Sequence, residues 1–253
     1  MDVSNRSSVV QTVKTVLAAS LSCAEEDLLR ERVSIHPAQS REGRLRFPIR
    51  NPSLTIATMG SGAVVACSRD RFAWAEEQLG SLSRGQLFSA QTAAKLQALV
   101  EPDAQFMAGP DQKYVCSAEE LAAYRIPEGV RVAMYEDGEI ASLYRHAAFT
   151  HALGFRADSP RPDRLAAAAE WNGKIVGIAG ASEDCEHMWQ IGVDVLPECQ
   201  GRGIGQAIVG TLTKAILAKG IVPYYSTEVS NLRSRQLAVR LGFWPAWVEM
   251  YAR

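Results

Sequence analysis

The sequence predicts an α/β (α+β) fold, in which a mixed sheet is flanked by helices and preceded by an N-terminal α/β subdomain. Three observations support this prediction. Apolar residues recur at helical spacing in residues 6–21, an Asn172-Gly173 pair separates two strand-like runs, and a strand, glycine turn, helix and strand follow one another in residues 188–229. The Asn-Gly pair is typical of a type I′ turn, because both central residues of that turn need positive φ.

Helical and extended segments alternate through the first 125 residues. After the helix at 6–21, a capping-box pattern predicts a short helix within residues 22–30. A glycine-rich hairpin signal stands at residues 60–62, and a second capping box predicts a short helix over residues 117–124. The remaining elements expected here are strands at 45–49, 53–58 and 63–68 and helices at 69–79 and 90–99.

A proline and a glycine at residues 126–129 mark the predicted boundary between two domains, residues 1–125 and 126–253. The second domain contains the strand, glycine turn, helix and strand of residues 188–229, and this order predicts parallel strands joined by a right-handed crossover. The elements expected in it are strands at 130–135, 164–171, 174–181, 188–196 and 222–229, an edge strand at 247–251, a loop at 159–162, and helices at 137–153, 204–219 and 231–241.

Composition excludes several classes of function. Apolar residues make up 47% of the 253 residues and the net charge is −1, so the chain is globular and lacks the basic excess that binds nucleic acid. No apolar run approaches the ~18 residues that a membrane span needs. The five cysteines are scattered without a C-x-x-C pair, which indicates free thiols and the cytoplasm. Cys185 and His187 alone are too few ligands for a metal, so we predict none.

Three glycines, Gly201, Gly203 and Gly205, lie between a predicted strand and the start of a helix. Glycines allow several backbone N–H groups to approach an anion, and the helix start adds a partial positive charge. A turn that uses glycine only for tight packing is the alternative. The spacing fits neither the G-x-G-x-x-G dinucleotide fingerprint nor the nucleotide P-loop, which weakens both of those assignments.

The turn, together with its flanks, resembles the GNAT superfamily of acyl-CoA N-acyltransferases. The turn follows the pattern Q/R-x-x-G-x-G/A, residues 193–198 resemble the fourth strand of that family, and Asn231 with the Leu241-Gly242-Phe243 ending resembles its final motif. The resemblance covers about residues 126–253 and implies a GNAT-like mixed sheet. Within the superfamily, residues 185–192 and 223–225 resemble a bacterial branch of two-part GNAT-like proteins.

The resemblance implies acetyl-CoA, or another acyl-CoA, as co-substrate. Relatives seat the pyrophosphate on the turn amides and pair the pantetheine arm with exposed backbone of the fourth strand, here Val193 and Val195. Asn231 matches a position that often contacts the cofactor, although a plain N-cap explains it equally well. The residues predicted to bind acetyl-CoA are Val193, Val195, Gln200, Gly201, Arg202, Gly203, Ile204, Gly205, Asn231 and Ser234.

The catalytic groups are harder to assign. A backbone N–H near Val193 is expected to hold the oxyanion. Many relatives carry a basic carboxylate on the fourth strand, but the matching position here is Trp189, and the nearby candidates are Asp184, Glu186 and His187. Many also use a tyrosine on the last helix as the acid, and that position here is Ala238. Tyr224, Tyr225, Tyr251 and water are the candidate replacements. From these groups we predict Glu186, His187 and Tyr225 as catalytic.

We therefore expect an N-acetyltransferase that moves an acetyl group from acetyl-CoA to an amine acceptor, either a small molecule or a protein amino group. The absent tyrosine keeps open an acyl-CoA-binding or regulatory protein that no longer turns over, and a third reading is an interaction scaffold. Residues 137–161 are expected to shape the acceptor site. Residues 1–125 are either a degenerate copy of the same architecture or a cap over that site. The sequence leaves open whether the chain forms a homodimer.

Overall fold

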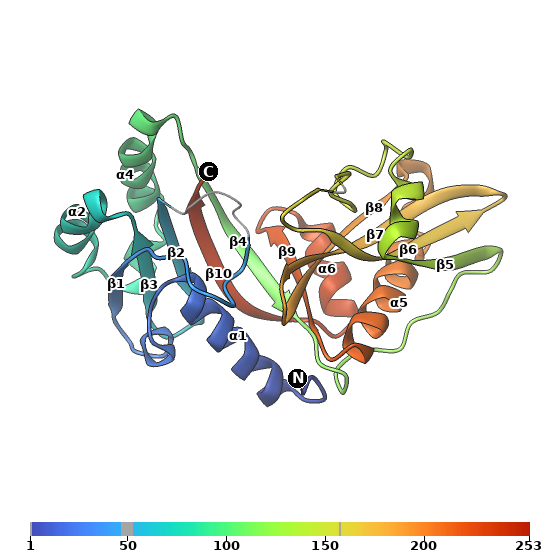
Figure 1. Cartoon of the computed structure of the whole chain (residues 1–253), viewed down its shortest axis with the longest axis horizontal. Coiled ribbons are helices and arrows are strands. Elements are labelled where there is room, and N and C mark those ends of the chain that lie inside the picture. Colours follow the sequence, from blue (N-terminus) through green and yellow to red (C-terminus); the bar gives the residue numbers. More distant parts are fainter. Residues whose placement is uncertain (1, 47–52, 157) are drawn as a thin grey trace. The chain divides into compact units, whose positions relative to one another are not determined.

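The computed structural model describes residues 2–46, 53–156 and 158–253, and it divides the chain into two compact units (Figure 1). The C-terminal unit comprises Met1–Val9, Tyr114–Ser226 and Leu232–Trp244. The N-terminal unit comprises Val10–Lys113, Thr227–Asn231 and Pro245–Arg253. The two units therefore interleave along the chain, and the predicted functional division at residues 125 and 126 stays a prediction.

The N-terminal unit contains strands in the order β1-β3-β2-β10-β4. The hairpin of β2 (Leu54–Thr58) and β3 (Ala63–Cys67) is antiparallel, as predicted, and β1 (Val33–Pro37) pairs parallel with β3. Every residue of β2 and β3 is buried. The remaining elements of this part of the chain are α1 (Arg6–Ser20), α2 (Arg69–Leu79), α3 (Arg84–Leu87), α4 (Ala90–Val100), β4 (Met107–Val115) and β10 (Trp244–Ala252).

Two predictions in this unit are corrected. The expected edge strand at 247–251 is an interior strand, because β10 lies between β2 and β4. The short helix expected within residues 22–30 is a single 3₁₀ turn, Glu25–Leu28. Of the strand expected at 45–49, residues 45 and 46 are not in a strand and 47–49 lie outside the described residues. The sequence analysis missed β1, α3 and β4.

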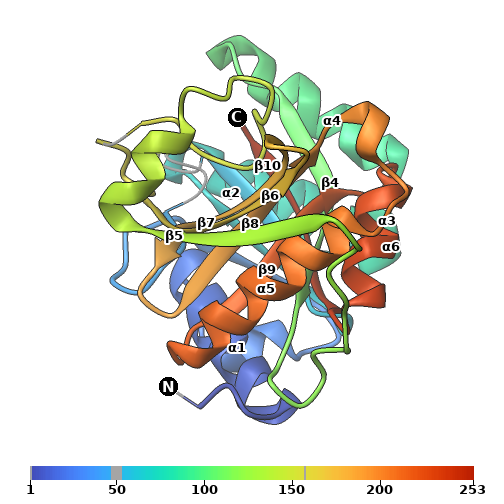
Figure 2. The ribbon, with the colours of Figure 1, turned by 90° about the vertical axis from the view of Figure 1, so that its right-hand side faces the viewer.

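The C-terminal unit contains strands in the order β9-β8-β7-β6-β5, with α5 on one face (Figure 2). Helix α5 packs across β5 to β8, and the segment that follows β5 lies on the opposite face of these strands. The bounds are β5 (Val130–Glu136), β6 (Asp163–Trp171), β7 (Lys174–Cys185), β8 (Met188–Val195), α5 (Ile204–Ala218), β9 (Val222–Glu228) and α6 (Leu232–Arg240).

The local signals of this unit are confirmed. Asn172 and Gly173 have φ of 51° and 73°, as a type I′ hairpin between β6 and β7 requires. Strands β8 and β9 pair in parallel across the α5 crossover. Apolar side chains of α5, β6, β7 and β8 form one buried cluster on the helix face of the sheet.

Two predicted helices are wrong. Residues 117–124 form a turn and an extended segment, because the Ala122 N–H donates to the Leu241 carbonyl and the Tyr124 ring packs against Gly210 of α5. The helix expected at 137–153 ends as a 3₁₀ helix at Leu143, and the remainder is a loop fastened to the sheet by hydrogen bonds.

A polar network lies on the face of the sheet opposite α5. The guanidinium of Arg161 donates to the buried Asp184 carboxylate at 2.5 Å and to Gln190 Oε1 at 2.6 Å. Ser182 donates to Asp184 at 3.0 Å, and the Tyr224 hydroxyl donates to both Asp184 and Gln190. The network therefore ties the loop at 159–162 to β7, β8 and β9, and Asp184 has the charged and polar partners that a buried carboxylate needs.

We expect Arg161→Met to lower the free energy of unfolding by about 3–5 kcal/mol, because it leaves the Asp184 charge buried without a cation. Arg156→Met is the matched control, since Arg156 pairs with Asp158 at the exposed surface and its loss should change the free energy of unfolding far less. Urea unfolding measures both. Adding Asp184→Asn to Arg161→Met should recover part of the loss. A cost for Arg161→Met as small as that of the control would contradict this account.

Gly242 has φ of 88°, and a Cβ on it would lie 1.8 Å from the Glu120 carbonyl oxygen. We expect Gly242→Ala to destabilise the protein by more than about 2 kcal/mol, because the alanine meets both left-handed strain and fixed backbone. Gly173→Ala isolates the strain, since Gly173 has φ of 73° and nothing within 4 Å of the added Cβ. Its cost should be about 1 kcal/mol in thermal or urea unfolding. Equal costs at the two positions would show that the Glu120 contact does not matter.

Candidate functional site

Strands β8 and β9 separate part of the way along their length. Their paired register runs from Met188 and Val222 to Ile191 and Tyr225, whereas β8 continues to Val195 and β9 to Glu228. The residues of β8 change from buried to half-buried after Ile191. The two parallel strands thus form a V-shaped opening, which exposes backbone groups that a flat sheet would pair.

Val193 presents its backbone to this opening. The Leu196 N–H donates to Val176 of β7, whereas the Val195 carbonyl accepts from the Gln200 side chain instead of from β7. Because successive residues of an antiparallel pair point to opposite sides, the N–H and C=O of Val193 share the direction of the Val195 carbonyl and face away from β7. The two residues predicted to pair with pantetheine therefore lie at the opening.

The glycine turn connects β8 to α5. Gly201 and Gly203 have φ of 75° and 81°, conformations that favour glycine, and Gly203 is the N-cap of α5. Gly205 is different, because a Cβ there would lie at ordinary distances of 3.6 and 3.7 Å from its neighbours. The first amides of α5, those of Ile204, Gly205 and Gln206, have no acceptor within the helix. The turn and the helix start thus form an anion-binding geometry. Positive φ explains the glycines at 201 and 203, and tight packing requires none of the three.

Arginines lie beside this turn. Gln200 bridges two elements, because its amide nitrogen donates to the Val195 carbonyl at 3.1 Å and its amide oxygen accepts from Arg233 of α6 at 2.7 Å. Arg202 stacks over the Trp171 ring, 5.0 Å from its centroid. Both guanidinium groups add positive charge next to the turn amides, which favours an anionic ligand.

Tyr225 occupies the last paired position before the opening, on the α5 face of the sheet. Burial raises the pKa of its phenol, a hydrogen bond with Ser234 of α6 lowers it, and the Asp194 charge raises it further. The phenol therefore stays protonated at neutral pH. Ala238 is fully buried in the same apolar cluster. The structure thus brings Tyr225 and Ser234 together, while the adjacent Tyr224 faces the Asp184 network on the other side.

The structure does not bring the other predicted catalytic residues to the opening. Glu186 and His187 form the turn between β7 and β8, and the His187 carbonyl accepts from the Val222 N–H. Val193 lies six positions further along the chain than His187, a distance of ~20 Å along an extended strand. Trp189, at the position of the family carboxylate, is buried, and its indole N–H lacks a partner among the described residues. Catalysis by Glu186 and His187 stays a prediction that this distance disfavours.

Asn231 lies immediately before the first residue of α6, is exposed, and donates its backbone N–H to the Glu228 carbonyl. It belongs to the N-terminal unit. Its predicted contact with acetyl-CoA stays a prediction.

The loop around His151 and Ala152 is held against the second half of β8, on the face opposite α5. Asp194 accepts from the backbone N–H groups of His151 and Ala152 at 2.7 and 3.1 Å, and its second oxygen lies 3.1 Å from His151 Nδ1. Gly180 and Gly192 pair across β7 and β8 beneath this contact. The sequence analysis missed Asp194 and gave His151 no role; paired glycines inside strands were the available signal of close backbone approach.

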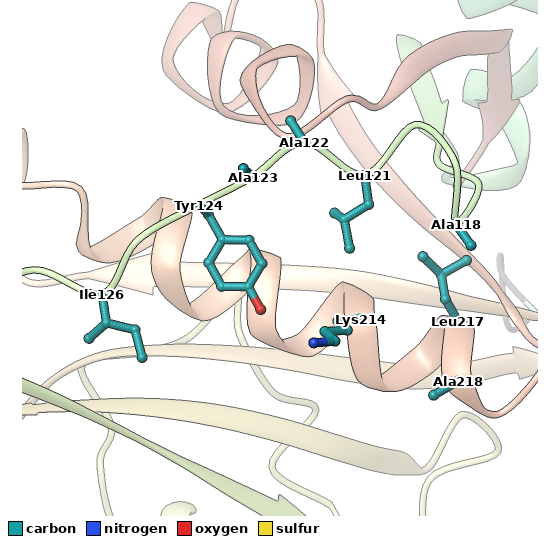
Figure 3. A pocket seen from close by; sticks show the side chains of 9 residues that line it. All are labelled: Ala118, Leu121, Ala122, Ala123, Tyr124, Ile126, Lys214, Leu217 and Ala218. Atoms are coloured by element: carbon teal, nitrogen blue, oxygen red, sulfur yellow. The ribbon is translucent and has the colours of Figure 1, made fainter.

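An open groove of about 830 Å³ lies along the outer face of α5 (Figure 3). Its lining is apolar except for Lys214 and the Tyr124 hydroxyl, and it contains none of the predicted site residues. The residues that line it are Ala118, Leu121, Ala122, Ala123, Tyr124, Ile126, Lys214, Leu217 and Ala218.

Within residues 2–46, 53–156 and 158–253, no three His, Cys, Asp or Glu side chains are grouped to hold a metal ion. Over the same residues, no helix combines the length and the apolar character that crossing a membrane requires.

A family model matches part of the C-terminal half of the chain. The model of the acetyltransferase (GNAT) family matches residues 132–243. A search of curated proteins with this sequence finds no match. Among solved structures, a GCN5-related N-acetyltransferase from Kribbella flavida matches with a TM-score of 0.50 and 15% identity, over 96% of this chain and 95% of its own.

Two further solved structures match parts of the chain. A GNAT-family acetyltransferase from Novosphingobium aromaticivorans matches 58% of this chain and 66% of its own, with 16% identity and a TM-score of 0.45. An aminoglycoside N-acetyltransferase in complex with CoA matches 49% of this chain and 93% of its own, with 16% identity and a TM-score of 0.36. The family-model match supports a GNAT-superfamily fold in the C-terminal half of this chain.

Proposed function

We propose that the C-terminal unit binds acetyl-CoA, or another acyl-CoA, between β8 and β9 and transfers the acyl group to an amine. Membership of its C-terminal half in an acetyltransferase family supports acyl transfer in general. The single observation that carries the finer proposal is the end of β8–β9 pairing at Ile191 and Tyr225, directly upstream of the glycine turn. An amide-bearing arm fits a backbone edge that has lost its partner, and a pyrophosphate fits the turn amides.

Each predicted group then has a defined task. The amides from Gln200 to Gly205 bind the pyrophosphate, and the Val193 and Val195 backbone pairs with the pantetheine amides. The Val193 N–H also lies where it can hold the carbonyl oxygen of the thioester as negative charge develops on it. Tyr225, protonated and buried at the apex of the opening, donates its proton to the departing thiolate.

The acceptor approaches from the face covered by residues 144–162, because the other face is filled by α5. A small-molecule amine and a protein amino group both fit this arrangement. The five cysteines are buried and form no disulfide bonds, which supports residence in the cytoplasm. The second candidate is an acyl-CoA-binding protein without turnover, and the observation that favours it is the buried Ala238 at the position of the usual acid.

Gly203→Asp tests the binding site. We expect this change to weaken acetyl-CoA binding at least about tenfold in calorimetry, because a carboxylate at the N-cap of α5 repels the pyrophosphate. The matched control is Gly173→Asp, which places the same residue at a similar positive φ in the β6–β7 hairpin. That variant should bind as the wild type does. A wild type that binds no acetyl-CoA would overturn the proposal.

Tyr225→Phe tests the proposed acid. We expect kcat for thiol release from acetyl-CoA to fall about 100-fold, while acetyl-CoA affinity changes little, since the phenol acts on the leaving thiolate. Ser234→Ala removes the hydrogen-bond partner of the phenol but keeps the proton donor, so its kcat should fall much less. An unchanged kcat in Tyr225→Phe would assign proton donation to another group. Binding without thiol release across an amine panel would favour the non-catalytic candidate.

A further inference from the structure

The pair of His151 and Asp194 is the one imidazole–carboxylate contact beside the opening in the described part of the chain. His151 Nδ1 lies 3.1 Å from Asp194 Oδ1, and the His151 side chain is 81% exposed, against 21% for Asp194. An ionised carboxylate only accepts hydrogen bonds, so Nδ1 is the donor in this contact, and a neutral imidazole in this tautomer keeps its lone pair on Nε2. Nε2 has no hydrogen-bond partner within the described residues. The imidazole is thus oriented by the protein and open to a second molecule.

The backbone fixes where this imidazole lies. A Cβ on Gly192 would come 2.0 Å from the His151 carbonyl oxygen, and a Cβ on Gly180 would come 2.1 Å from that of Ala152. The loop can therefore lie on the sheet only because both strands carry glycine at this cross-strand pair. Asp194 then fastens the loop through two backbone N–H groups. His151 consequently sits over Gly192, next to Val193 along β8, beside the proposed thioester.

We propose that His151 is the general base of acyl transfer and that Asp194 positions it, an inference that rests on the acyl transfer proposed above. The nitrogen of the uncharged amine attacks the thioester carbonyl carbon, and a C–N bond forms while the amine proton passes to His151 Nε2. The tetrahedral intermediate collapses with cleavage of the C–S bond, and the thiolate takes the proton of the Tyr225 hydroxyl. His151 then loses its proton to solvent and Tyr225 regains one, so the net products are an amide and free CoA thiol.

The two faces of the sheet separate the two proton transfers. His151 and Asp194 lie on the loop face, because Asp194 shares strand parity with Gly192 and Gln190. Tyr225 lies on the α5 face. A thioester passing between β8 and β9 therefore meets a base on the side from which the acceptor comes and an acid on the side from which its CoA arm enters. Base and acid consequently do not neutralise each other by direct contact.

The other titratable groups described on the loop face form contacts with residues other than His151. Asp184 is fully buried against Arg161, and Asp163 accepts from the Gly154 N–H and the Tyr144 hydroxyl. Burial raises the pKa of Asp163, and these hydrogen bonds oppose the shift. His146 contacts Arg145 and the Phe149 ring, and within the described residues it has no partner on β8. Asp194 is the only charged group that contacts the His151 ring in the described residues, and Thr150 Oγ1 lies 3.3 Å from the same Nδ1.

The experiment compares thiol release from acetyl-CoA by His151→Gln and His146→Gln across an amine panel, with acetyl-CoA binding measured on each sample. We expect His151→Gln to lower kcat about 100-fold and to leave acetyl-CoA affinity unchanged, because a glutamine cannot accept the proton. His146→Gln makes the same chemical change in the same loop and should lower kcat far less than His151→Gln does.

Two variants separate catalysis from structure. His151→Ala should regain activity in proportion to added imidazole, which a merely structural histidine would not do. Asp194→Asn should lower kcat, and combining it with His151→Gln should cost no more than His151→Gln alone, since Asp194 acts through His151. Additive losses, or no rescue by imidazole, would overturn the assignment.

The outcomes distinguish this inference from the function on which it rests. If the wild type releases thiol and His151→Gln stays within threefold of it, His151 is not the base, and acyl transfer stands. If the wild type binds acetyl-CoA but releases no thiol with any amine or with water, both the proposed acyl transfer and the assignment of His151 as its general base are wrong. If the wild type does not bind acetyl-CoA, the ligand assignment fails as well.

Discussion

The end of pairing between β8 and β9 is the constraint on which the candidate site depends. Up to Ile191 and Tyr225 the two strands satisfy each other's backbone groups, and beyond that point β8 continues for four residues paired with β7 but not with β9. A sheet edge in the middle of a domain has unpaired hydrogen-bonding groups, which must be satisfied by water, by side chains or by a ligand. Gln200 already takes the Val195 carbonyl in this way. An opening of this kind therefore selects ligands rich in amides, and the turn at its mouth selects those that also carry phosphate.

The opposite face depends on the same strand for a different reason. Parity along β8 directs Val193 and Val195 toward α5 and directs Gly192 and Asp194 toward the loop. Glycine at 192 gives the loop backbone room, and aspartate at 194 gives it hydrogen-bond acceptors. These four consecutive residues thereby have two roles. Val193 and Val195 form the proposed ligand-binding edge, and Gly192 and Asp194 anchor the loop on the acceptor side. A one-residue shift of register would exchange these roles and destroy both.

Local signals in the sequence predicted what local physics determines. The Asn-Gly hairpin, the glycine turn and the α5 crossover each rest on backbone preferences of a few residues, and each is confirmed. The failures are non-local. A capping box at 117–120 did not produce a helix, because Ala122 bonds to Leu241 and Tyr124 docks on Gly210, contacts that no local pattern reveals. The prediction that β10 is an edge strand was wrong, because the order of strands in a sheet depends on which distant segments pair and not on the composition of one strand.

The catalytic assignment shows the same limit more sharply. Sequence reasoning sought a base close to the glycine motif and selected Glu186 and His187. Because each strand residue adds about 3.3 Å, these two residues lie at the far end of β8 from Val193. The histidine that the fold brings beside Val193 precedes its carboxylate partner by 43 residues in a loop with no regular structure. Its location follows from Gly180 and Gly192 on neighbouring strands. Neither glycine alone predicts that the loop lies against the sheet; only the β7–β8 register, which pairs them, indicates it. Pairing register, and not proximity in the chain, thus decides which titratable groups reach the thioester.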